Sequence, residues 1–242
     1  MKVLKFEISG KYAHFRKPYT TVSPLTFLIP TRPTIAGIIG AILGKPKNDV
    51  TCQNANSYIA IGLKENYSVK KIRIGVNLAK VPSNFDCESG YVDLSDIKNK
   101  INLKRYECLK DVKYNIYFCH NECILNEFKA CLENHTSYYT PYLGISEFIA
   151  NFEYLGEFDA NNVQNSRSIK INSVAPKKYL DENSINFYQD AEYIVQRMPN
   201  RLDENRIVKD YTEVIFERKG LPLIATAKKY WELSNGENII FL

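Results

Sequence analysis

Three histidines, His14, His120 and His135, are the side chains of this chain best suited to proton transfer near neutral pH. A metal-independent ribonuclease needs a base for the 2′-hydroxyl group and an acid for the leaving oxygen. His120 follows an alternating apolar segment, and Lys113 and Tyr117 precede it closely, so these three residues are the best catalytic candidates. The competing interpretation, which we favour, is that His120 is an ordinary polar residue at a strand end.

Cys119, Cys123, Cys131 and His135 lie close together in the sequence, but their spacing matches no standard zinc finger. If residues 123–134 form a helix, Cys123 and Cys131 are two turns, or about 12 Å, apart. One tetrahedral zinc ion with Zn–S distances of about 2.3 Å cannot bridge them. We therefore expect ordinary buried thiols and no metal. The sequence has no P-loop, Rossmann fingerprint or nucleophile elbow, so we expect no cofactor.

The segment His14-Phe-Arg-Lys17 alternates groups that stack with groups that bind phosphate. Aromatic rings and cations in such a mixture are typical of surfaces that bind single-stranded RNA. The alternative is that Phe15 simply points into the core. In this setting His14 is better suited to contact RNA than to transfer protons.

The net charge of +5 is unevenly distributed along the chain. Residues 1–80 carry 13 Lys and Arg but only 3 Asp and Glu, a net charge of +10. Residues 81–242 carry 19 Lys and Arg and 24 Asp and Glu, a net charge of −5. This asymmetry indicates a polyanionic partner for one face, although an uneven solvated surface would give the same counts.

The segment 27–44 predicts an apolar helix that the rest of the chain surrounds. Thr31 or Arg32 suits the N-cap, Pro33 suits the first turn, and Gly44 suits the end of the helix. Two further glycines, at positions 37 and 40, suggest that another backbone approaches closely. The helix start beside Arg32 also suits a phosphate group.

The composition is that of an ordinary globular protein, with 45% hydrophobic and 24% charged residues in a chain of 242. The first residues alternate in polarity and do not resemble a signal peptide, and six irregularly spaced cysteines are typical of a reducing compartment. The apolar run of the helix is about nine residues, too short for a membrane span. We therefore expect a cytoplasmic protein that has no contact with a membrane.

Apolar periodicity predicts the order strand, helix, strand, strand, helix, strand for the first part of the chain. That order is the split-βαβ, ferredoxin-like (RRM-like) plan, so we expect an α+β fold with such a domain at residues 1–158. The short segment 58–63 could be a strand or a helix. The other strands and the second helix are expected at 2–9, 70–78, 112–118, 148–158 and 123–134.

Between the strands expected at 70–78 and 112–118 lie about thirty mostly polar residues, far more than a hairpin needs. We expect an insertion at about 81–111 that is either functional or disordered. Residues 159–242 contain no strong helix pattern and predict a β-rich C-terminal region. Its strands are expected at 168–173, 191–198, 205–218, 223–233 and 238–242.

Three motifs together indicate a resemblance to a known family. They are Gly10-x3-His14-Phe-Arg16, the run from Pro30 to Gly44, and Thr140-Pro-Tyr-Leu-Gly-Ile-Ser-Glu-Phe148. The chain resembles the Cas-five family of CRISPR-associated proteins, most closely its type I-B branch. The resemblance spans the chain, but its specific residues lie in 1–44 and 138–158.

The resemblance implies a ferredoxin-like N-terminal domain and a non-catalytic subunit of the Cascade surveillance complex that binds the crRNA 5′ handle. It implies a Cas-seven backbone subunit and a Cas-eight large subunit as protein partners. The insertion at about 81–111 falls where the family carries a thumb beside the crRNA. By motif position, the implied handle contacts are His14, Arg16, Lys17, Arg32 and Thr34, followed by Gly144 and Ser146.

The type I-C branch of the family cuts precursor crRNA with a Tyr, Lys and His set in which Lys and His are adjacent. Here Cys119 precedes His120, and this departure favours a protein that does not cut RNA. Two alternatives stay open: a metal-independent endoribonuclease that uses His120, Tyr117 and Lys113, and a scaffold that touches only other proteins.

Overall fold

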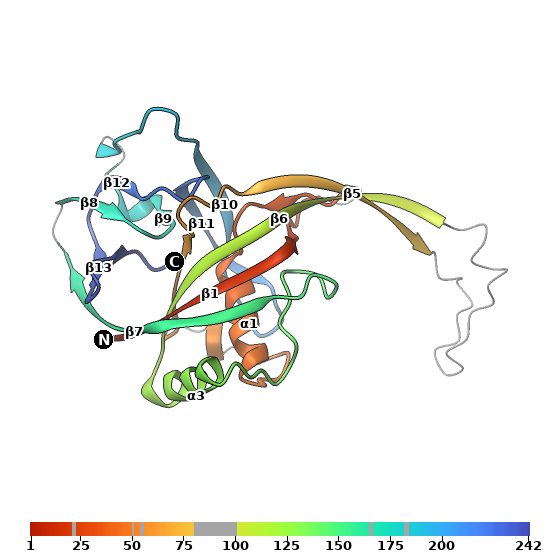
Figure 1. Cartoon of the computed structure of the whole chain (residues 1–242), viewed down its shortest axis with the longest axis horizontal. Coiled ribbons are helices and arrows are strands. Elements are labelled where there is room, and N and C mark those ends of the chain that lie inside the picture. The colour runs from red at the N-terminus through yellow and green to blue at the C-terminus, as the bar shows by residue number, and fades with distance from the viewer. Residues whose placement is uncertain (21–22, 50, 54–55, 80–100, 165–166, 182–183) are drawn as a thin grey trace.

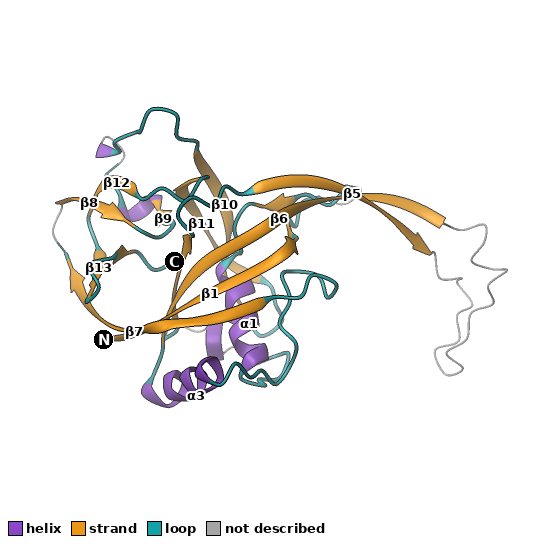
Figure 2. Ribbon diagram, viewed as in Figure 1, coloured by secondary structure: helices purple, strands orange, loops and turns teal. Residues whose placement is uncertain are grey.

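The computed structural model describes residues 1–242 except 21–22, 50, 54–55, 80–100, 165–166 and 182–183. Strands dominate the described residues, and the two α-helices lie together on one side of the largest sheet (Figure 2). The fold is therefore α+β with a β-rich character. The strands are β1 (Lys2–Ala13), β2 (Phe15–Arg16), β3 (Thr26–Phe27), β4 (Tyr58–Leu63), β5 (Lys70–Ala79), β6 (Ile101–Cys119), β7 (Asn151–Val163), β8 (Arg167–Ile171), β9 (Ala175–Pro176), β10 (Tyr193–Leu202), β11 (Val208–Glu217), β12 (Leu223–Ala227), β13 (Tyr230–Leu233) and β14 (Asn238–Ile239).

The helices begin and end where short polar residues and glycine can satisfy their free backbone groups. Helix α1 (Arg32–Ile42) begins after Thr31, whose side chain accepts a hydrogen bond from the Thr34 amide. Helix α3 (Glu122–Glu133) begins after Asn121, which caps it in the same way. Two 3₁₀ turns, η1 (Thr51–Gln53) and η2 (Lys177–Tyr179), complete the helical segments of the described chain.

The largest sheet has the strand order β14-β13-β7-β1-β6-β4, and β5 pairs with the far part of β6. Strand β1 lies at its centre and pairs antiparallel with β6 on one side and β7 on the other. Successive side chains of a strand point to opposite faces of the sheet. Phe6 of β1 therefore belongs to one hydrophobic cluster and Val3 to another.

The two faces of this sheet carry separate hydrophobic clusters. On the helix side, Phe128 of α3 makes edge contacts with Phe6 and Phe118, with ring centroids 5.1 and 5.4 Å away. On the other side, Tyr117 belongs to a cluster that also contains Trp231 and other C-terminal residues. The second cluster joins the C-terminal region to the sheet.

The expected close approach at the helix glycines is wrong. A Cβ at Gly37 would meet nothing within 4 Å, and one at Gly40 would only touch Lys45 at 3.8 Å. Gly44 does end the helix as expected: its φ of 69° allows the Lys45 amide to reach the Gly40 carbonyl at 2.8 Å and the Gly44 amide to reach Ala41 at 3.3 Å.

The expected insertion at about 81–111 is too long, because residues 101–111 belong to β6. Their pairing with β5 runs from Lys70 opposite Lys110 to Ala79 opposite Ile101 and forms a two-stranded ribbon that projects from the body (Figure 1). The rest of the expected insertion, residues 80–100, lies outside the described residues. The undecided segment 58–63 is strand β4.

The C-terminal strands form two smaller sheets, β10-β11-β9 and β12-β8, and also extend the main sheet. Strand β7 continues across the expected boundary at residue 158 and pairs with β13 from Ala160 to Val163. Strand β10 contacts α1, so the C-terminal residues also cover the helix.

Candidate nucleic-acid interface

His14 lies between β1 and β2 and is buried, with 2% of its surface exposed. Its amide donates to the Leu143 carbonyl at 2.9 Å, and its Nδ1 donates to the Glu107 carbonyl at 2.8 Å. Burial lowers the pKa of His14 below its ordinary value, more than the bond to Glu107 raises it. The imidazole is therefore neutral and ties β1, β6 and the loop after α3 together.

The motif around Gly144 meets the motif around His14. Gly144 has a φ of 97°, and a Cβ at this position would collide with the His14 carbonyl oxygen. Only glycine fits such a position without strain. Ser146 lies on the surface of the same loop, where its hydroxyl donates to the Glu147 carboxylate at 3.1 Å. The structure thus places the expected handle residues of two distant segments side by side.

Glu107 of β6 organises the other side of this junction. Its carboxylate lies 3.0 Å from Lys71 Nζ and accepts from the Thr26 amide at 3.3 Å. Burial would raise the pKa of Glu107, but these two bonds and the charge of nearby Lys17 lower it below its ordinary value. The ionised carboxylate holds the base of the ribbon against β3.

Arg16 and Lys17 extend from this junction toward solvent. Arg16 is exposed and donates to the Thr20 carbonyl at 3.1 Å. Lys17 is half-buried, with its Nζ 5.7 Å from the Phe27 ring centroid and 6.0 Å from that of Tyr19. Lys17 is thus presented beside two aromatic rings, whereas Arg16 is held within its own loop.

The ribbon adds three exposed cations that the sequence did not single out. Lys71, Arg73 and Arg105 share one side of it, because Arg73 lies opposite Glu107 and Arg105 lies opposite Gly75. This is the side on which Glu107 meets Lys71, so the three cations continue the surface of Arg16 and Lys17. The alternation of Lys71 and Arg73 with Ile72 and Ile74 could have indicated that the two cations share one side of a strand. Arg105 could not be placed in this way, because it fell in the expected insertion.

Arg32 and Thr34 lie in the first turn of α1. Arg32 is 3% exposed, and its guanidinium donates to the carbonyls of Ser57 at 2.6 Å, Gln53 at 3.1 Å and Asn200 at 3.4 Å. Burial, with the charge of Arg201, lowers its pKa to about 10. Thr34 is half-buried and its hydroxyl lies 2.9 Å from that of Thr31. Arg32 therefore binds the protein interior, in contrast to the surface position that the sequence suggested.

The main sheet separates the members of the alternative catalytic set. Tyr117 is buried on the C-terminal side and donates to Glu237 at 3.2 Å; burial, then the charge of Glu237, raises its pKa well above the ordinary value. Lys113 lies on the same side, 3.7 Å from Glu7. His120 follows Phe118 on the helix side, where its Nδ1 accepts from the Asn121 amide and its Nε2 donates to the Thr51 carbonyl.

The cysteines around α3 also face different layers. Cys119 packs in the cluster on the C-terminal side, whereas Cys131 packs against the helix-side core and Cys123 is exposed. Within the described part of the chain, no three His, Cys, Asp or Glu side chains are grouped to hold a metal ion. None of the helices described here is long and apolar enough to cross a membrane.

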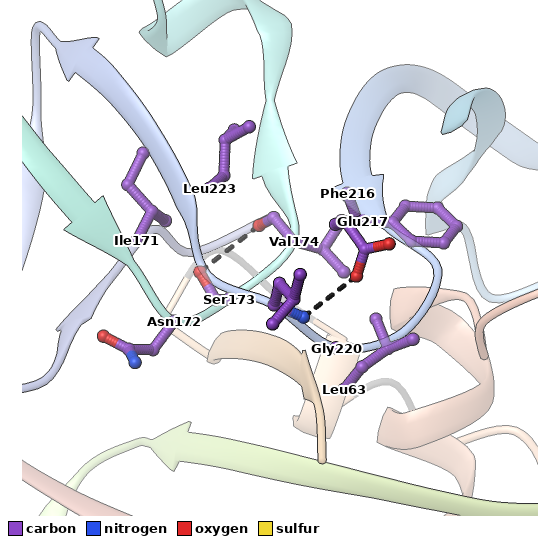
Figure 3. A pocket seen from close by; sticks show the side chains of 10 residues that line it. Leu63, Ile171, Asn172, Ser173, Val174, Phe216, Glu217, Gly220 and Leu223 are labelled. Atoms are coloured by element: carbon purple, nitrogen blue, oxygen red, sulfur yellow. Dashed lines mark hydrogen bonds between the residues drawn. The ribbon is translucent and has the colours of Figure 1, made fainter. Parts of the chain in front are cut away.

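A small cavity lies between β4, β8 and the end of β11 (Figure 3). Its volume is about 20 Å³, which suits a water molecule better than a ligand. Glu217 on its wall is held by the amides of Lys219 at 2.7 Å and Leu221 at 3.0 Å, and the Ser173 hydroxyl lies 3.3 Å from the Val174 carbonyl. These polar groups are hydrogen-bonded within the protein.

A family model described as CRISPR-associated protein (Cas_Cas5) matches residues 3–215. No curated protein matches the sequence. The chain is similar in structure to a CRISPR protein from Archaeoglobus fulgidus, with 14% identity, 98% of each chain covered and a TM-score of 0.56. A chain of a CRISPR RNA-guided surveillance complex matches with 11% identity and a TM-score of 0.49, over 98% of this chain and 93% of that one.

Proposed function

Since this chain belongs to the Cas-five family of CRISPR-associated proteins, we propose that it is the Cascade subunit that seats the 5′ handle of the crRNA. In this role it caps the row of Cas-seven subunits, contacts the Cas-eight large subunit and serves antiviral defence in the cytoplasm. It binds RNA without cutting it.

The surface around Glu107 is the observation that supports RNA binding most directly. Five cations from three distant segments share this surface, and four of them are exposed. They are Arg16, Lys17, Lys71, Arg73 and Arg105. Aromatic rings lie beside Lys17, and single-stranded RNA is bound by this combination of cations and stacking groups. Gly144 borders the surface through its contact with His14, and Ser146 is exposed on the same loop.

The other side of the ribbon supports contact with a protein. Ile72, Ile74 and Val76 share this side with Cys108 and Tyr106, and also with Lys70, Lys104 and Lys110. The three aliphatic side chains are partly exposed, and Val76 is 37% exposed. A ribbon with cations on one side and partly exposed aliphatic residues among lysines on the other suits insertion between RNA and a neighbouring Cas-seven subunit.

The strand order supports the ferredoxin-like, RRM-like plan for residues 1–158. Strands β7, β1, β6 and β4 lie in this order and pair antiparallel, and α1 and α3 connect them on one side. That is the arrangement of two interleaved βαβ units. The opposite side is partly covered by the C-terminal strands.

A non-catalytic role is supported by the separation of His120 from Tyr117 and Lys113. A general base and acid must lie within hydrogen-bonding reach of the same substrate, and the sheet keeps these groups apart. Both ring nitrogens of His120 are also occupied by backbone groups.

The test is to incubate the full chain with labelled repeat RNA and with a scrambled RNA of equal length, in EDTA. We expect preferential retention of the repeat RNA and no cleavage. Cleavage in EDTA that His120→Ala abolishes would replace our assignment with the endoribonuclease. Absence of RNA retention at low salt would favour the protein-only scaffold.

A further inference from the structure

The loop after α3 presents two tyrosines to solvent. Tyr138 is 75% exposed and Tyr139 is 50% exposed, with ring centroids 4.7 Å apart. Their amides donate to the carbonyls of Ile42 at 3.1 Å and Ala41 at 3.0 Å, and the Tyr138 ring packs on Gly44. Both tyrosines are therefore held in place by the end of α1, although at least half of the surface of each is exposed.

The exposed side of α3 adjoins the tyrosines. Lys45, the residue after Gly44, lies 3.3 Å from Glu127 of α3 and so joins the two helices at this point. Glu122, Glu127 and Glu133 are exposed along α3, whereas Lys129 is half-buried and bound to Glu157. We call the surface of these three glutamates, Tyr138 and Tyr139 the acidic tyrosine surface.

The charge around this surface is opposite to that of the candidate RNA interface. Residues 130–143, which include both tyrosines, contain no Lys or Arg, and α3 carries three exposed glutamates beside the single Lys129. An RNA backbone would be repelled here, since phosphates need cations. Rigid, exposed tyrosines are instead typical of residues that anchor protein–protein contacts.

We propose that the acidic tyrosine surface docks a basic, Lys- and Arg-rich protein surface. Charge complementarity orients such a partner and excludes nucleic acid, while the two aromatic rings supply the buried contact area. The chain then has two separate faces: cations around Glu107 for RNA, and this surface for a protein.

Site-specific photocrosslinking in the assembled surveillance complex tests this assignment. A benzophenone amino acid replaces Tyr138 in one variant and Tyr19, which is 70% exposed beside Lys17, in a second. We expect position 138 to crosslink a Lys- and Arg-rich peptide of another protein subunit. A crosslink from position 138 to RNA or to a second copy of this chain, or no crosslink at all, would overturn the assignment. Position 19 reports separately on RNA binding.

Charge reversal supplies an independent measurement, and its cost to the fold is limited to the exposed ion pairs of Glu127 with Lys45 and of Glu133 with Lys129. Glu133 ends α3, where lysine suits the helix dipole better than glutamate, and Glu127 is exposed. Glu127→Lys combined with Glu133→Lys should weaken assembly of the complex roughly tenfold or more. Glu204→Lys, an exposed reversal elsewhere, should assemble normally. Equal assembly of the two reversed proteins, both folded, would contradict a docking role.

Discussion

Arg16 and Arg32 show how burial separates two residues of the same type. Arg16 is exposed and makes one bond within its own loop, whereas Arg32 donates to three carbonyls from three segments. A buried guanidinium supplies hydrogen-bond donors to backbone carbonyls that would otherwise lack a partner. Arg32 therefore joins α1 to the segments that carry Gln53, Ser57 and Asn200.

Replacing Arg32 with methionine should destabilise the protein. The change leaves the Ser57, Gln53 and Asn200 carbonyls without their donor, and a buried unsatisfied group costs about 1–3 kcal/mol. We expect a loss of roughly 3 kcal/mol or more in the free energy of unfolding, measured in urea. Arg16→Met is the matched control and should stay within about 0.5 kcal/mol of the parent. Equal losses in both variants would contradict the structural role of Arg32.

Reversing Arg16 and Arg73 to glutamate should weaken RNA binding and leave the melting temperature unchanged. Each phosphate contact on a single strand contributes a slope of about −0.7 to log K against log salt. The double variant should lose two contacts, so its slope should be shallower by about 1.4. Lys209→Glu, an exposed reversal on β11, is the control. A parental slope in the double variant would remove both arginines from the interface.

The pH dependence of stability should show a contribution from His14. Because burial lowers its pKa in the folded state, the unfolded chain binds the proton first as the pH falls. The free energy of unfolding should then decrease below about pH 6.5, the ordinary value, and His14→Gln should remove this decrease. The lowered pKa of Glu107 acts at more acidic pH, below 4.5, so the two effects separate in a pH series. Identical curves for the parent and His14→Gln above pH 5 would contradict the buried neutral imidazole.

Helix α1 shows which glycine signals can be interpreted from a sequence. The end at Gly44 was predictable, because a glycine with a proline two residues later, Pro46, is a strong local stop signal. The spacing of Gly37 and Gly40 suggested close packing, but spacing does not reveal which side of a helix faces solvent. Only the placement of the sheet and β10 determines that Gly37 is exposed.

Alanine substitutions in α1 should therefore have opposite signs. Gly37→Ala should raise the free energy of unfolding by roughly 0.5–1 kcal/mol, because the new methyl group meets open space and alanine favours the helix. Gly44→Ala should lower it by about 1–2 kcal/mol or more, because a φ of 69° is strained for alanine and the methyl group would strike Tyr138. Urea unfolding of both variants checks the pair. Destabilisation by Gly37→Ala would show that the helix packs differently.

The ribbon of β5 and β6 should be removable without unfolding the body. Deleting residues 74–106 and joining Arg73 to Glu107 through Asn-Gly keeps the pairing at the base, where Lys71 meets Glu107. We expect a parental melting temperature, weaker RNA binding and loss of assembly with Cas-seven. Size-exclusion of the co-produced subunits measures assembly. Normal assembly of the shortened chain would show that the ribbon is not the thumb.

Across the whole molecule, local patterns predicted the elements and missed the long-range contacts. The period-two and period-3.6 patterns located β1, α1 and α3, because these patterns depend only on near neighbours in sequence. They located β4 only as an apolar segment. The family resemblance named His14 and Gly144 as implied handle contacts, but nothing in the sequence predicted that their backbones meet. The interior position of Arg32 depends on Ser57 and Asn200, which no local pattern connects to it. Arg105 was overlooked because it fell in the expected insertion, whereas Lys71 and Arg73 lay on an expected strand whose partner was unknown.

The partly exposed aliphatic residues of the ribbon also have a consequence for the cell that makes this protein. Ile72, Ile74 and Val76 lie on a projecting pair of strands, and exposed β-branched strands adhere to one another. A copy synthesised in excess of its neighbours would be an orphan chain prone to aggregation and clearance. We therefore expect the soluble yield to follow the supply of the other subunits, so that the abundance of this protein is set by assembly as much as by its own rate of translation.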